Sequence, residues 1–517
     1  MFCFALLLFF PGLGARDLWA PVEPRYAEIV RVMFSKGEWI VPTINGALYT
    51  DKPILYFWIA LLAAKLSGEV SEWAVRLPAA LGGVGVVLTT YFIGRDFYSA
   101  RVGALAALVL ATSYRVIWEA RWAHVDMLFS CFFVLTVYFG ARALLRRGVP
   151  NEILPVYVFM ALATLTKGLI GIVLPALLLI AFMIARRDWS LIRAAKLPLG
   201  VPLFAAVAAP WFYLASRASD GKWLIDFLYI HHLQRYAAGT GHRQPFYYYL
   251  TTLPVDFLPW TAFFIPAVAH RSYRPPWNHP HTQLFFLWFA VVLVFFSLSA
   301  TKRDLYLLPL FPPLALLVAN YLNDLAAQDW GGRRFGLWFT VILFGSVALS
   351  GLALPLAVWT LRPEFFRLLL PPTIVAASGG LAVTALILRR RPAPVAISLG
   401  AMMLLLTVTA AFWVFPRLEP FKSHRQFAAE INRRVPAAAP LYVYKDTTND
   451  FNYYARREKI SVLDAPAEIA RLRDAGEKSY VLVKERALRK LPAMAAESII
   501  ARRALGDTTW HLLALGE

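Results

Sequence analysis

Residues 77–94 read LPAALGGVGVVLTTYFIG, a stretch without a single charged side chain. A run of this length and composition is typical of a helix that crosses a lipid bilayer. Similar runs recur at 169–185 and 284–300, and 59% of the 517 residues are apolar while only 16% are charged. A water-soluble chain would not carry so much apolar sequence in blocks. The pattern therefore predicts an all-α polytopic membrane protein.

We expect about thirteen membrane-spanning helices from these apolar runs. They fall at 1–14, 74–94, 101–118, 124–144, 152–166, 168–185, 197–216, 246–270, 281–299, 304–321, 336–357, 369–388 and 395–414. The first is short for a span of ~20 residues. Because it lacks the basic start and small-residue cleavage site of a signal peptide, we interpret it as an uncleaved span. The apolar stretch 52–67 is expected to lie in the membrane interface, because counting it as a span breaks the alternation of loop charges.

The net charge of +20 is spread over short basic groups between the apolar runs, so no nucleic-acid partner is expected. Every second loop carries the arginines, which predicts that these loops and the N-terminus are cytoplasmic. The opposite loops, above all 15–73 and 217–245, then face the exterior or periplasm. Long loops on one face usually hold the function of a helical membrane protein. The two cysteines both lie inside apolar runs and predict no disulfide.

The chain changes character after residue 414. Strand-like segments such as LYVYK and SYVLVK are separated by amphipathic stretches in residues 415–517. This alternation predicts a small α/β domain on the outer side. We therefore expect two domains, a membrane domain over 1–414 and an α/β domain over 415–517.

Charged side chains beside the spans are the leading candidates for function, because an unpaired charge in hydrocarbon is costly. The outer loops and span ends contribute Glu23, Arg25, Tyr26, Asp51, Lys52, Arg76, Asp126, Lys167, His231, His232, Arg235, His242, Lys302 and Tyr306. Most are cations or polar rings, and few are carboxylates. Arginine and lysine at a lipid interface suit a phosphate. Carboxylates among them suit a general base or a metal.

Simpler interpretations stand beside several of these candidates. Arg25 and Glu28 are spaced for an ion pair on an interfacial helix. Asp51 and Lys52 have the pattern of an N-cap followed by a lysine that reaches to the interface. His231 and its neighbour occur more often as interfacial polar residues than as metal ligands. Asp126 and Lys167 have no obvious partner nearby in the sequence, so they carry more weight.

Motifs in a fixed order add a resemblance to a known family. They include EPRYAEI at 23–29, the segment 37–58 ending in DKPILYFW, AHVDMLF at 123–129, TLTKGLIGIVLP at 164–175 and SATKRDLYLLPL at 299–310. In this order the chain resembles the aminoarabinose transferases of lipid A and the related protein O-mannosyltransferases, which share the helical fold called glycosyltransferase type C. The resemblance runs from the first loop to about residue 320.

The resemblance implies transfer of a sugar, pentose or hexose, from an undecaprenyl phosphate carrier to lipid A or another periplasmic acceptor in the bacterial inner membrane. It implies that Lys52 and Arg235, with Lys302 and Tyr306, bind the donor phosphate. Asp126 corresponds to the family's second acidic position. Asp51 with His231 or His232 could contribute to a divalent metal site, although no cofactor is firmly implied. The surrounding candidates Arg25, Tyr26, Arg76, Lys167 and His242 would line the pocket.

One departure from the family concerns the acid usually treated as catalytic. Relatives commonly carry Asp-Glu where this chain has Val22-Glu23. Either Glu23 takes over the role, Asp126 carries it, or this branch is altered in activity. If the acceptor is a lipid phosphate, deprotonation is hardly needed and the position can vary.

Three alternatives to a lipid A transferase remain open on the sequence. The acceptor could be a protein or a growing glycan, as in O-mannosyltransferases. The chain could transport a lipid-linked anion, although it shows no internal repeat of the kind common in transporters. A non-catalytic lipid-binding role is the third, and Val22 keeps it open.

Overall fold

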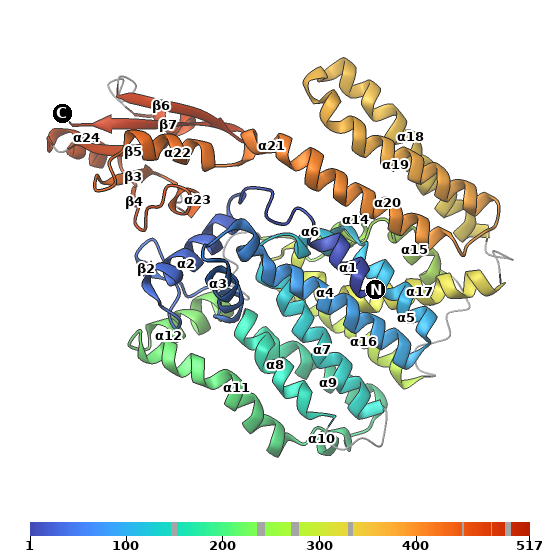
Figure 1. The fold of residues 1–517 in the computed structure, drawn as a ribbon. Coiled ribbons are helices and arrows are strands. Elements are labelled where there is room, and N and C mark those ends of the chain that lie inside the picture. The colour runs from blue at the N-terminus through green and yellow to red at the C-terminus, as the bar shows by residue number, and fades with distance from the viewer. Residues whose placement is uncertain are drawn as a thin grey trace. The chain divides into compact units, whose positions relative to one another are not determined.

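The computed structural model describes residues 1–145, 152–234, 243–269, 279–328, 334–446, 449–476, 478–491 and 498–516. The chain divides into two compact units (Figure 1). The first unit comprises residues 1–13, 50–56 and 78–414. The second comprises residues 14–49, 57–77 and 415–517, so the first long loop groups with the C-terminal segment. Each unit is described by itself.

The first unit is built of helices (Figure 1). In chain order they are α1 (Phe2–Phe9), α4 (Glu72–Phe97, from residue 78), α5 (Ala100–Ala111), α6 (Tyr114–Ala120), α7 (Val125–Leu145), α8 (Leu154–Lys167), α9 (Ile170–Arg186), α10 (Leu191–Ala194), α11 (Leu197–Arg217), α12 (Lys222–Leu228), η1 (Tyr229–Gln234), α14 (Tyr248–Asp256), α15 (Thr261–Ala269), α16 (Pro280–Leu298), η3 (Asp304–Leu310), α17 (Phe311–Gln328), α18 (Arg334–Leu361), η4 (Pro363–Phe365), α19 (Phe366–Leu388), α20 (Val395–Thr409) and η5 (Ala410–Val414).

These helices confirm a polytopic membrane protein. Within the described residues, eight helices are long and apolar enough to cross a membrane, or ten if each of two bent pairs counts as one span. Helices α8 and α9 are apolar but shorter. Every expected span coincides with a helix or a bent pair. The expected span 1–14 is shorter than predicted, since α1 has eight residues.

Two expected spans are broken rather than continuous. The span 101–118 bends by 67° between α5 and α6, and the span 246–270 bends by 118° between α14 and α15. Pro259 lies at the second bend, and proline cannot supply the backbone N–H that continues a helix. The two bends contact each other: the Trp260 Nε1 donates to Thr112 Oγ1 at 3.0 Å, and the Tyr114 backbone N–H donates to the Leu258 carbonyl at 2.9 Å. The second of these hydrogen bonds satisfies backbone groups that the broken helices leave free.

Close helix contacts at two glycines position the start of α7 and the end of α8. A Cβ built on Gly82 of α4 would lie 2.8 Å from the backbone of Leu128, and one on Gly171 of α9 would lie 2.5 Å from the backbone nitrogen of Thr164. Only glycine permits backbones to approach so closely. Gly168, with φ +91°, ends α8 directly after Lys167.

The second unit joins segments from both ends of the chain. Its elements are α2 (Val22–Lys36), β1 (Thr43–Ile44), β2 (Ala47–Leu48), most of α3 (Leu55–Ser67), the first turn of α4, α21 (Phe415–Lys422), α22 (Arg425–Arg434), β3 (Leu441–Tyr444), α23 (Asn449–Asn452), β4 (Ser461–Leu463), α24 (Pro466–Asp474), β5 (Ser479–Lys484), α25 (Glu485–Leu488), β6 (Ile499–Leu505) and β7 (Thr508–Leu515). Its mixed helices and strands confirm the predicted α/β character of the C-terminal segment.

The sheet of the second unit has the strand order β4-β3-β5-β7-β6. Strand β3 runs parallel to β4 and β5, and β7 runs antiparallel to β5 and β6. One side of the sheet packs on Phe427 and Ile431 of α22, and the other contacts Ile469 of α24.

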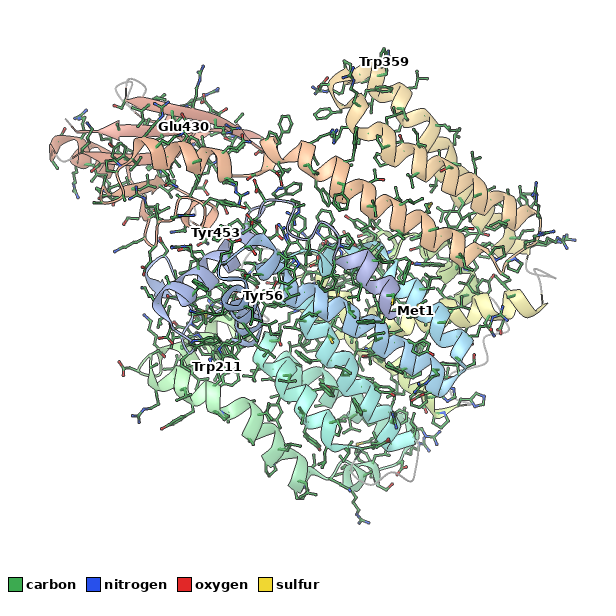
Figure 2. All side chains as sticks on the ribbon, viewed as in Figure 1. Met1, Tyr56, Trp211, Trp359, Glu430 and Tyr453 are labelled. Atoms are coloured by element: carbon green, nitrogen blue, oxygen red, sulfur yellow. The ribbon has the colours of Figure 1, made fainter. Side chains whose placement is uncertain are left out.

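Polar contacts tie the first long loop to this domain. The Tyr453 hydroxyl, labelled in Figure 2, donates to the Val70 carbonyl at 2.6 Å, and the Asn45 side chain donates to the Ile460 carbonyl at 2.9 Å. Helix α2 packs on α23. The loop is therefore part of the fold of the second unit rather than a free connection.

Candidate functional site

Asp126 and Lys167 form a buried ion pair in the first unit. Asp126 is the second residue of α7 and Lys167 is the last residue of α8, 41 positions away. The Lys167 Nζ donates to Asp126 Oδ1, and each side chain keeps only 10% of its surface exposed. Both charges thus lie where α7 begins and α8 ends, which explains why neither has a partner nearby in the sequence.

Aromatic rings surround the ammonium of Lys167. Its Nζ lies 4.7 Å from the ring centre of Tyr306 and 5.0 Å from that of Phe129. The face of an aromatic ring attracts a cation, most strongly where water is excluded. Tyr306 in turn packs on Phe296, with ring centres 5.3 Å apart. The predicted site residues Asp126, Lys167 and Tyr306 are therefore together.

Lys52, Asp51 and His231 form a second group in the same unit. The Lys52 Nζ donates to Asp51 Oδ1 at 2.8 Å, and the His231 Nδ1 lies 3.4 Å from the same oxygen. The His231 Nε2 lies 3.1 Å from the Thr50 hydroxyl. The Lys52 side chain is 17% exposed, so it is not fully enclosed. Two of the predicted metal ligands are thus neighbours of a predicted phosphate ligand.

The donor set fits a metal poorly as far as the structure describes it. Asp51 and His231 supply two ligands, and no group of three His, Cys, Asp or Glu residues that could hold an ion occurs among the described residues. The side chain of His232 lies outside that description. The Lys52 ammonium already neutralises the Asp51 oxygen that a metal would use. We assign no reaction step to a metal.

Lys302 and Arg303 differ sharply in their contacts. The Lys302 Nζ donates to the Ser299 carbonyl at 2.6 Å and to the Gln244 carbonyl at 3.1 Å, and the residue is 4% exposed. Its ammonium is bound to the backbone that follows α16. The Arg303 guanidinium has no hydrogen-bond or ion-pair partner among the described residues. Among the described contacts, Arg303 is thus the more available cation of the two, and the motif SATKRD contained it.

The three cations Lys52, Lys167 and Arg303 act on one region. Lys52 and Arg303 are both close enough to Lys167 to repel its charge, and Arg303 also acts on Asp126. Three cations accompany the two carboxylates of Asp51 and Asp126, so the group carries an excess of positive charge. Such an arrangement can hold an anion and stabilise charge that develops on it during a reaction.

A second charged cluster in this unit was missed from the sequence. Arg115 of α6 contacts Glu119 at 3.4 Å, Asp256 of α14 at 2.7 Å and Asp304 of η3. The Glu119 carboxylate also contacts His124, with Oε2 2.7 Å from Nδ1. A signal was present, because Arg115 lies inside the expected span 101–118, and charge within a span marks function.

Glu23 belongs to the second unit and is fully buried between two arginines. Its carboxylate accepts hydrogen bonds from Arg16 Nη1 at 2.8 Å, from Arg76 Nε at 2.7 Å and from the Trp19 backbone N–H at 3.0 Å. Further bonds come from the second nitrogens of both guanidinium groups. Burial alone would raise the pKa of Glu23, but the two arginines hold that pKa well below its usual range. The bonds use the full acceptor capacity of the carboxylate.

The neighbours of Glu23 have structural contacts as well. Arg76 also donates to the carbonyls of Arg16 and Asp17. Tyr26 packs edge-on against Phe57, with ring centres 5.2 Å apart. The suggested pair of Arg25 with Glu28 is wrong, because Glu28 binds Arg31 through two hydrogen bonds of 2.7 Å. The Arg25 Nε is buried without a hydrogen bond among the described residues. The predicted site residues Arg235 and His242 lie outside the described residues.

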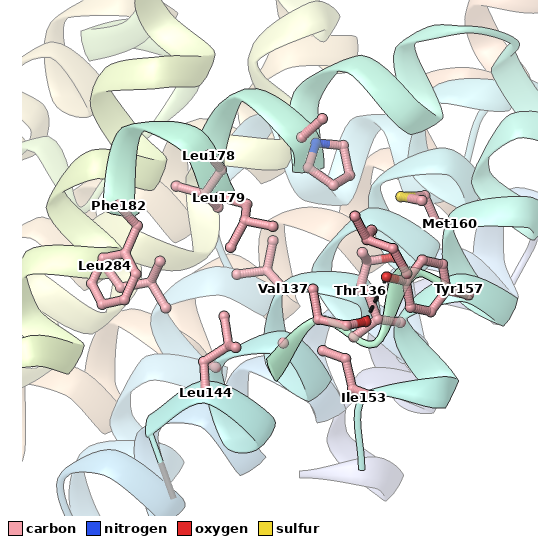
Figure 3. A pocket seen from close by; sticks show the side chains of 17 residues that line it. Thr136, Val137, Leu144, Ile153, Tyr157, Met160, Leu178, Leu179, Phe182 and Leu284 are labelled. Carbon is pink, nitrogen blue, oxygen red and sulfur yellow. Dashed lines mark hydrogen bonds between the residues drawn. The ribbon is translucent and has the colours of Figure 1, made fainter. Parts of the chain in front are cut away.

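An apolar cavity of about 170 Å³ lies among α7, α8, α9 and α11 (Figure 3). Its lining includes Val137, Tyr157, Leu178 and Phe182 and contains no charged residue. The Tyr157 hydroxyl donates to the Ala195 carbonyl at 2.7 Å, so its polar atom is satisfied. This cavity offers no groups for chemistry, and the charged groups above are the candidate site.

Comparison with known proteins finds similar sequences and a similar fold. Residues 51–214, which hold Lys52, Asp126 and Lys167, match the family described as dolichyl-phosphate-mannose-protein mannosyltransferase. The undecaprenyl phosphate-alpha-4-amino-4-deoxy-L-arabinose arabinosyl transferase of Shewanella sediminis is 27% identical over 90% of this chain and 86% of its own. The crystal structure of ArnT from Cupriavidus metallidurans bound to undecaprenyl phosphate has a TM-score of 0.81 at 23% identity, covering 99% of this chain and 96% of that one.

The chain has the fold of this structure, the helical fold called glycosyltransferase type C, and it is similar in sequence to the aminoarabinose transferases. The chain is also 28% identical to the corresponding transferase of Edwardsiella ictaluri, over 68% of its own length. It spans 64% of the length of that relative, which is less than two thirds. Glu23 lies before the range matched by the mannosyltransferase family, whereas the ion pair of Asp126 with Lys167 lies within it.

Proposed function

We propose that this protein transfers a sugar of the 4-amino-4-deoxy-L-arabinose type from undecaprenyl phosphate to lipid A or another outward-facing lipid or glycan acceptor. The observation that supports it most is that Lys52 and Arg303 both lie near Lys167, which pairs with the buried Asp126. A polyprenyl phosphate presents one anionic phosphate at the membrane surface. The positive charge of the three cations is complementary to that phosphate. The names of the relatives support the choice of donor.

The phosphate is a competent leaving group once its charge is stabilised. Lys52 and Arg303 would hold its oxygens, together with Arg235 from the sequence hypothesis, and would stabilise the charge that grows as the bond to the sugar breaks. Tyr306 would keep the Lys167 ammonium in place through its ring. A single displacement would invert the anomeric carbon.

Asp126 pairs with Lys167, one of these cations, and we assign it to orienting the sugar or acceptor while Lys167 fixes its position. Glu23 remains the catalytic alternative that the sequence suggested. Its saturated hydrogen bonds favour a role in holding the first loop, with Arg76 as the partner.

The orientation that fits this function places the N-terminus in the cytoplasm and the site and the C-terminal domain in the periplasm of a bacterial inner membrane. The alternation of basic loops supports it. Cysteine labelling from outside the membrane tests it: a cysteine introduced at Asp474 should react, and one introduced at Arg389 should not.

Turnover by the purified protein is the decisive experiment. Undecaprenyl phosphate carrying 4-amino-4-deoxy-L-arabinose is mixed with lipid A, and the modified lipid is measured by mass spectrometry. Wild-type transfer that is lost in Lys52→Ala and in Arg303→Ala supports the proposal. Donor binding without any turnover would favour a lipid-binding or transport role instead.

A protein acceptor is the second candidate, because residues 51–214 match a protein mannosyltransferase family. Mass spectrometry of exported proteins and of lipid A from a deletion strain separates the two. A divalent metal held by Asp51 and His231 remains as a sequence hypothesis, which predicts that chelation lowers transfer and that added divalent ions restore it. Because the donor set fits a metal poorly, we expect chelation to leave transfer unchanged.

A further inference from the structure

Glu119 and His124 form a buried pair that the proposed function has not used. Glu119 lies in α6 and is 1% exposed, and His124 lies directly before α7 and is 8% exposed. The His124 Nδ1 lies 2.7 Å from the Glu119 Oε2, and Arg115 binds the other oxygen of Glu119 at 3.4 Å. The carboxylate is thus anchored on one side and fixes the imidazole on the other.

The imidazole lies beside the candidate site. His124 is two residues before Asp126, and the charges of Asp126 and Arg303 both act on it. When Nδ1 donates to Glu119, Nε2 carries the lone pair. This nitrogen has no hydrogen-bond partner among the described residues, and the side chain keeps 10% of its surface exposed. A carboxylate that orients a histidine whose other nitrogen is free is the arrangement of a general base.

We propose that His124, oriented by Glu119, is the general base that accepts the proton of a hydroxyl acceptor, and the proposal rests on the transferase function above. As the acceptor oxygen forms its bond to the anomeric carbon, its proton passes to His124 Nε2. The bond between that carbon and the phosphate oxygen breaks, and its electron pair leaves with the polyprenyl phosphate. Charge and atoms balance without a further reactant.

The pair of Glu119 and His124 favours a hydroxyl over a phosphate as the acceptor. A hydroxyl must lose its proton as it attacks, whereas a phosphate monoester is already largely ionised at neutral pH. A base of this kind assists a hydroxyl and adds little for a phosphate. It would also supply the function that the usual acid provides in relatives, whose position is Val22 in this chain.

The charged groups that face His124 set its titration. Burial lowers the pKa of His124, but the Glu119 carboxylate raises it above the ordinary value, with Asp126 adding to the rise and Arg303 opposing it. A base protonated at low pH gives the rate an acidic limb. Removing Glu119 should move that limb to lower pH.

The test compares two probes with undecaprenyl phosphate-aminoarabinose as donor: lipid A with its phosphates, and lipid A from which they have been removed. We expect wild type to use the hydroxyl probe. We expect His124→Gln to lower its kcat about 100-fold or more with unchanged donor KM, and to abolish the acidic limb. Glu119→Gln should shift that limb to lower pH. His511→Gln, which removes a similar pair with Glu485 in the C-terminal domain, is the matched control and should be unchanged.

The outcomes separate this proposal from the function on which it rests. If wild type turns over neither probe and does not release sugar to water, the transferase function itself fails. If wild type transfers only to the phosphate probe, or if His124→Gln keeps the wild-type kcat and pH profile, the general-base proposal is overturned and the transferase stands. Should His124→Gln fail to fold, the pH profile of Glu119→Gln decides alone, since an unshifted limb overturns the proposal.

Discussion

Lys302 and Arg303 are adjacent in the chain, yet only one of them has a free charge among the described residues. The Lys302 ammonium is bound to the carbonyls of Ser299 and Gln244, while Arg303 acts on Asp126 and Lys167. The backbone at Arg303 is extended, with φ −136° and ψ 144°, so consecutive side chains point in opposite directions. The sequence shows two cations here, and the backbone decides which can bind a ligand.

Arg303→Gln should raise the KM for the polyprenyl-phosphate donor about 10- to 100-fold, because a charge-assisted hydrogen bond to phosphate is lost. Lys302→Gln should instead lower the thermal stability and leave the donor KM within a few fold. Donor titrations and melting curves of the two variants in detergent make the comparison. An unchanged KM in Arg303→Gln together with a raised one in Lys302→Gln would restore the original assignment.

Asp126→Asn should leave the Lys167 charge unpaired in a buried setting. We expect it to lower kcat about 100-fold and to destabilise the protein by about 3–5 kcal/mol, because both side chains of the pair are only 10% exposed. The double variant Asp126→Asn with Lys167→Met removes both charges and should recover part of the stability but none of the activity. Recovery of turnover in the double variant would show that the pair is structural.

Glu23→Gln tests whether the first-loop carboxylate is structural. It leaves Arg16 and Arg76 without their counter-charge, so we expect a loss of about 3–5 kcal/mol at pH 7. The pKa of native Glu23 lies below its unfolded value, so this stability is present above the unfolded pKa and declines as the pH falls below ~4.3. The difference between wild type and variant should therefore narrow in acid.

Turnover decides between the two roles of Glu23. If Glu23 holds the loop, the folded fraction of Glu23→Gln should transfer sugar at nearly the wild-type rate. An unchanged melting temperature with abolished turnover would instead make it the catalytic acid that the family resemblance suggested. Glu28→Gln is a suitable control, because Glu28 pairs with the more exposed Arg31 on the same helix.

The parts of the fold that follow from local pattern could be predicted. The apolar runs located the helices, and the strand-like segments after residue 414 located the sheet. The alternation of basic loops predicted that the start of α7 and the end of α8 lie on one face of the membrane. The ion pair of Asp126 with Lys167 could therefore have been predicted. The breaks at Thr112 and Pro259 were missed, because apolar residues recur on both sides of each break.

The pairing of charges depends on tertiary structure and was harder to predict. Glu28 has arginines at both three positions before and three positions after it, and only packing selects Arg31. Glu23 looked free because Arg76 lies 53 positions away, beyond the first long loop. Arg115 was overlooked since it lies within an expected span, although that placement is itself unusual and needed a partner.

Asp450 and His424 in the C-terminal domain have pKa values that are shifted in opposite directions. Burial raises the pKa of Asp450 to about 6, with Asp446 adding to the rise while Lys484 and Arg25 oppose it. Burial lowers the pKa of His424 to about 4, with Lys484 lowering it further and Asp446 raising it. His424 packs on Phe451 next to Asp450, with ring centres 4.9 Å apart.

The two shifts have opposite effects on stability. Between about pH 4 and 6 native Asp450 binds more protons than the unfolded chain, so its contribution to stability falls as the pH rises. Over the same range native His424 binds fewer protons than the unfolded chain, so its contribution rises with pH. Each contributes a slope of about 1.4 kcal/mol per pH unit, and the two nearly cancel in the wild type.

Replacing one of the two residues should reveal the pH dependence that the other gives to the free energy of unfolding. Asp450→Asn should leave the rising slope of His424, so that the domain gains about 3 kcal/mol between pH 4 and 6.5. His424→Gln should leave the falling slope of Asp450. Hydrogen exchange of the backbone amides of β3, followed from pH 4 to 7 in the full-length protein after correction for intrinsic exchange, measures both. A flat profile in both variants, or a slope already present in the wild type, would show that the two groups do not carry these opposed shifts.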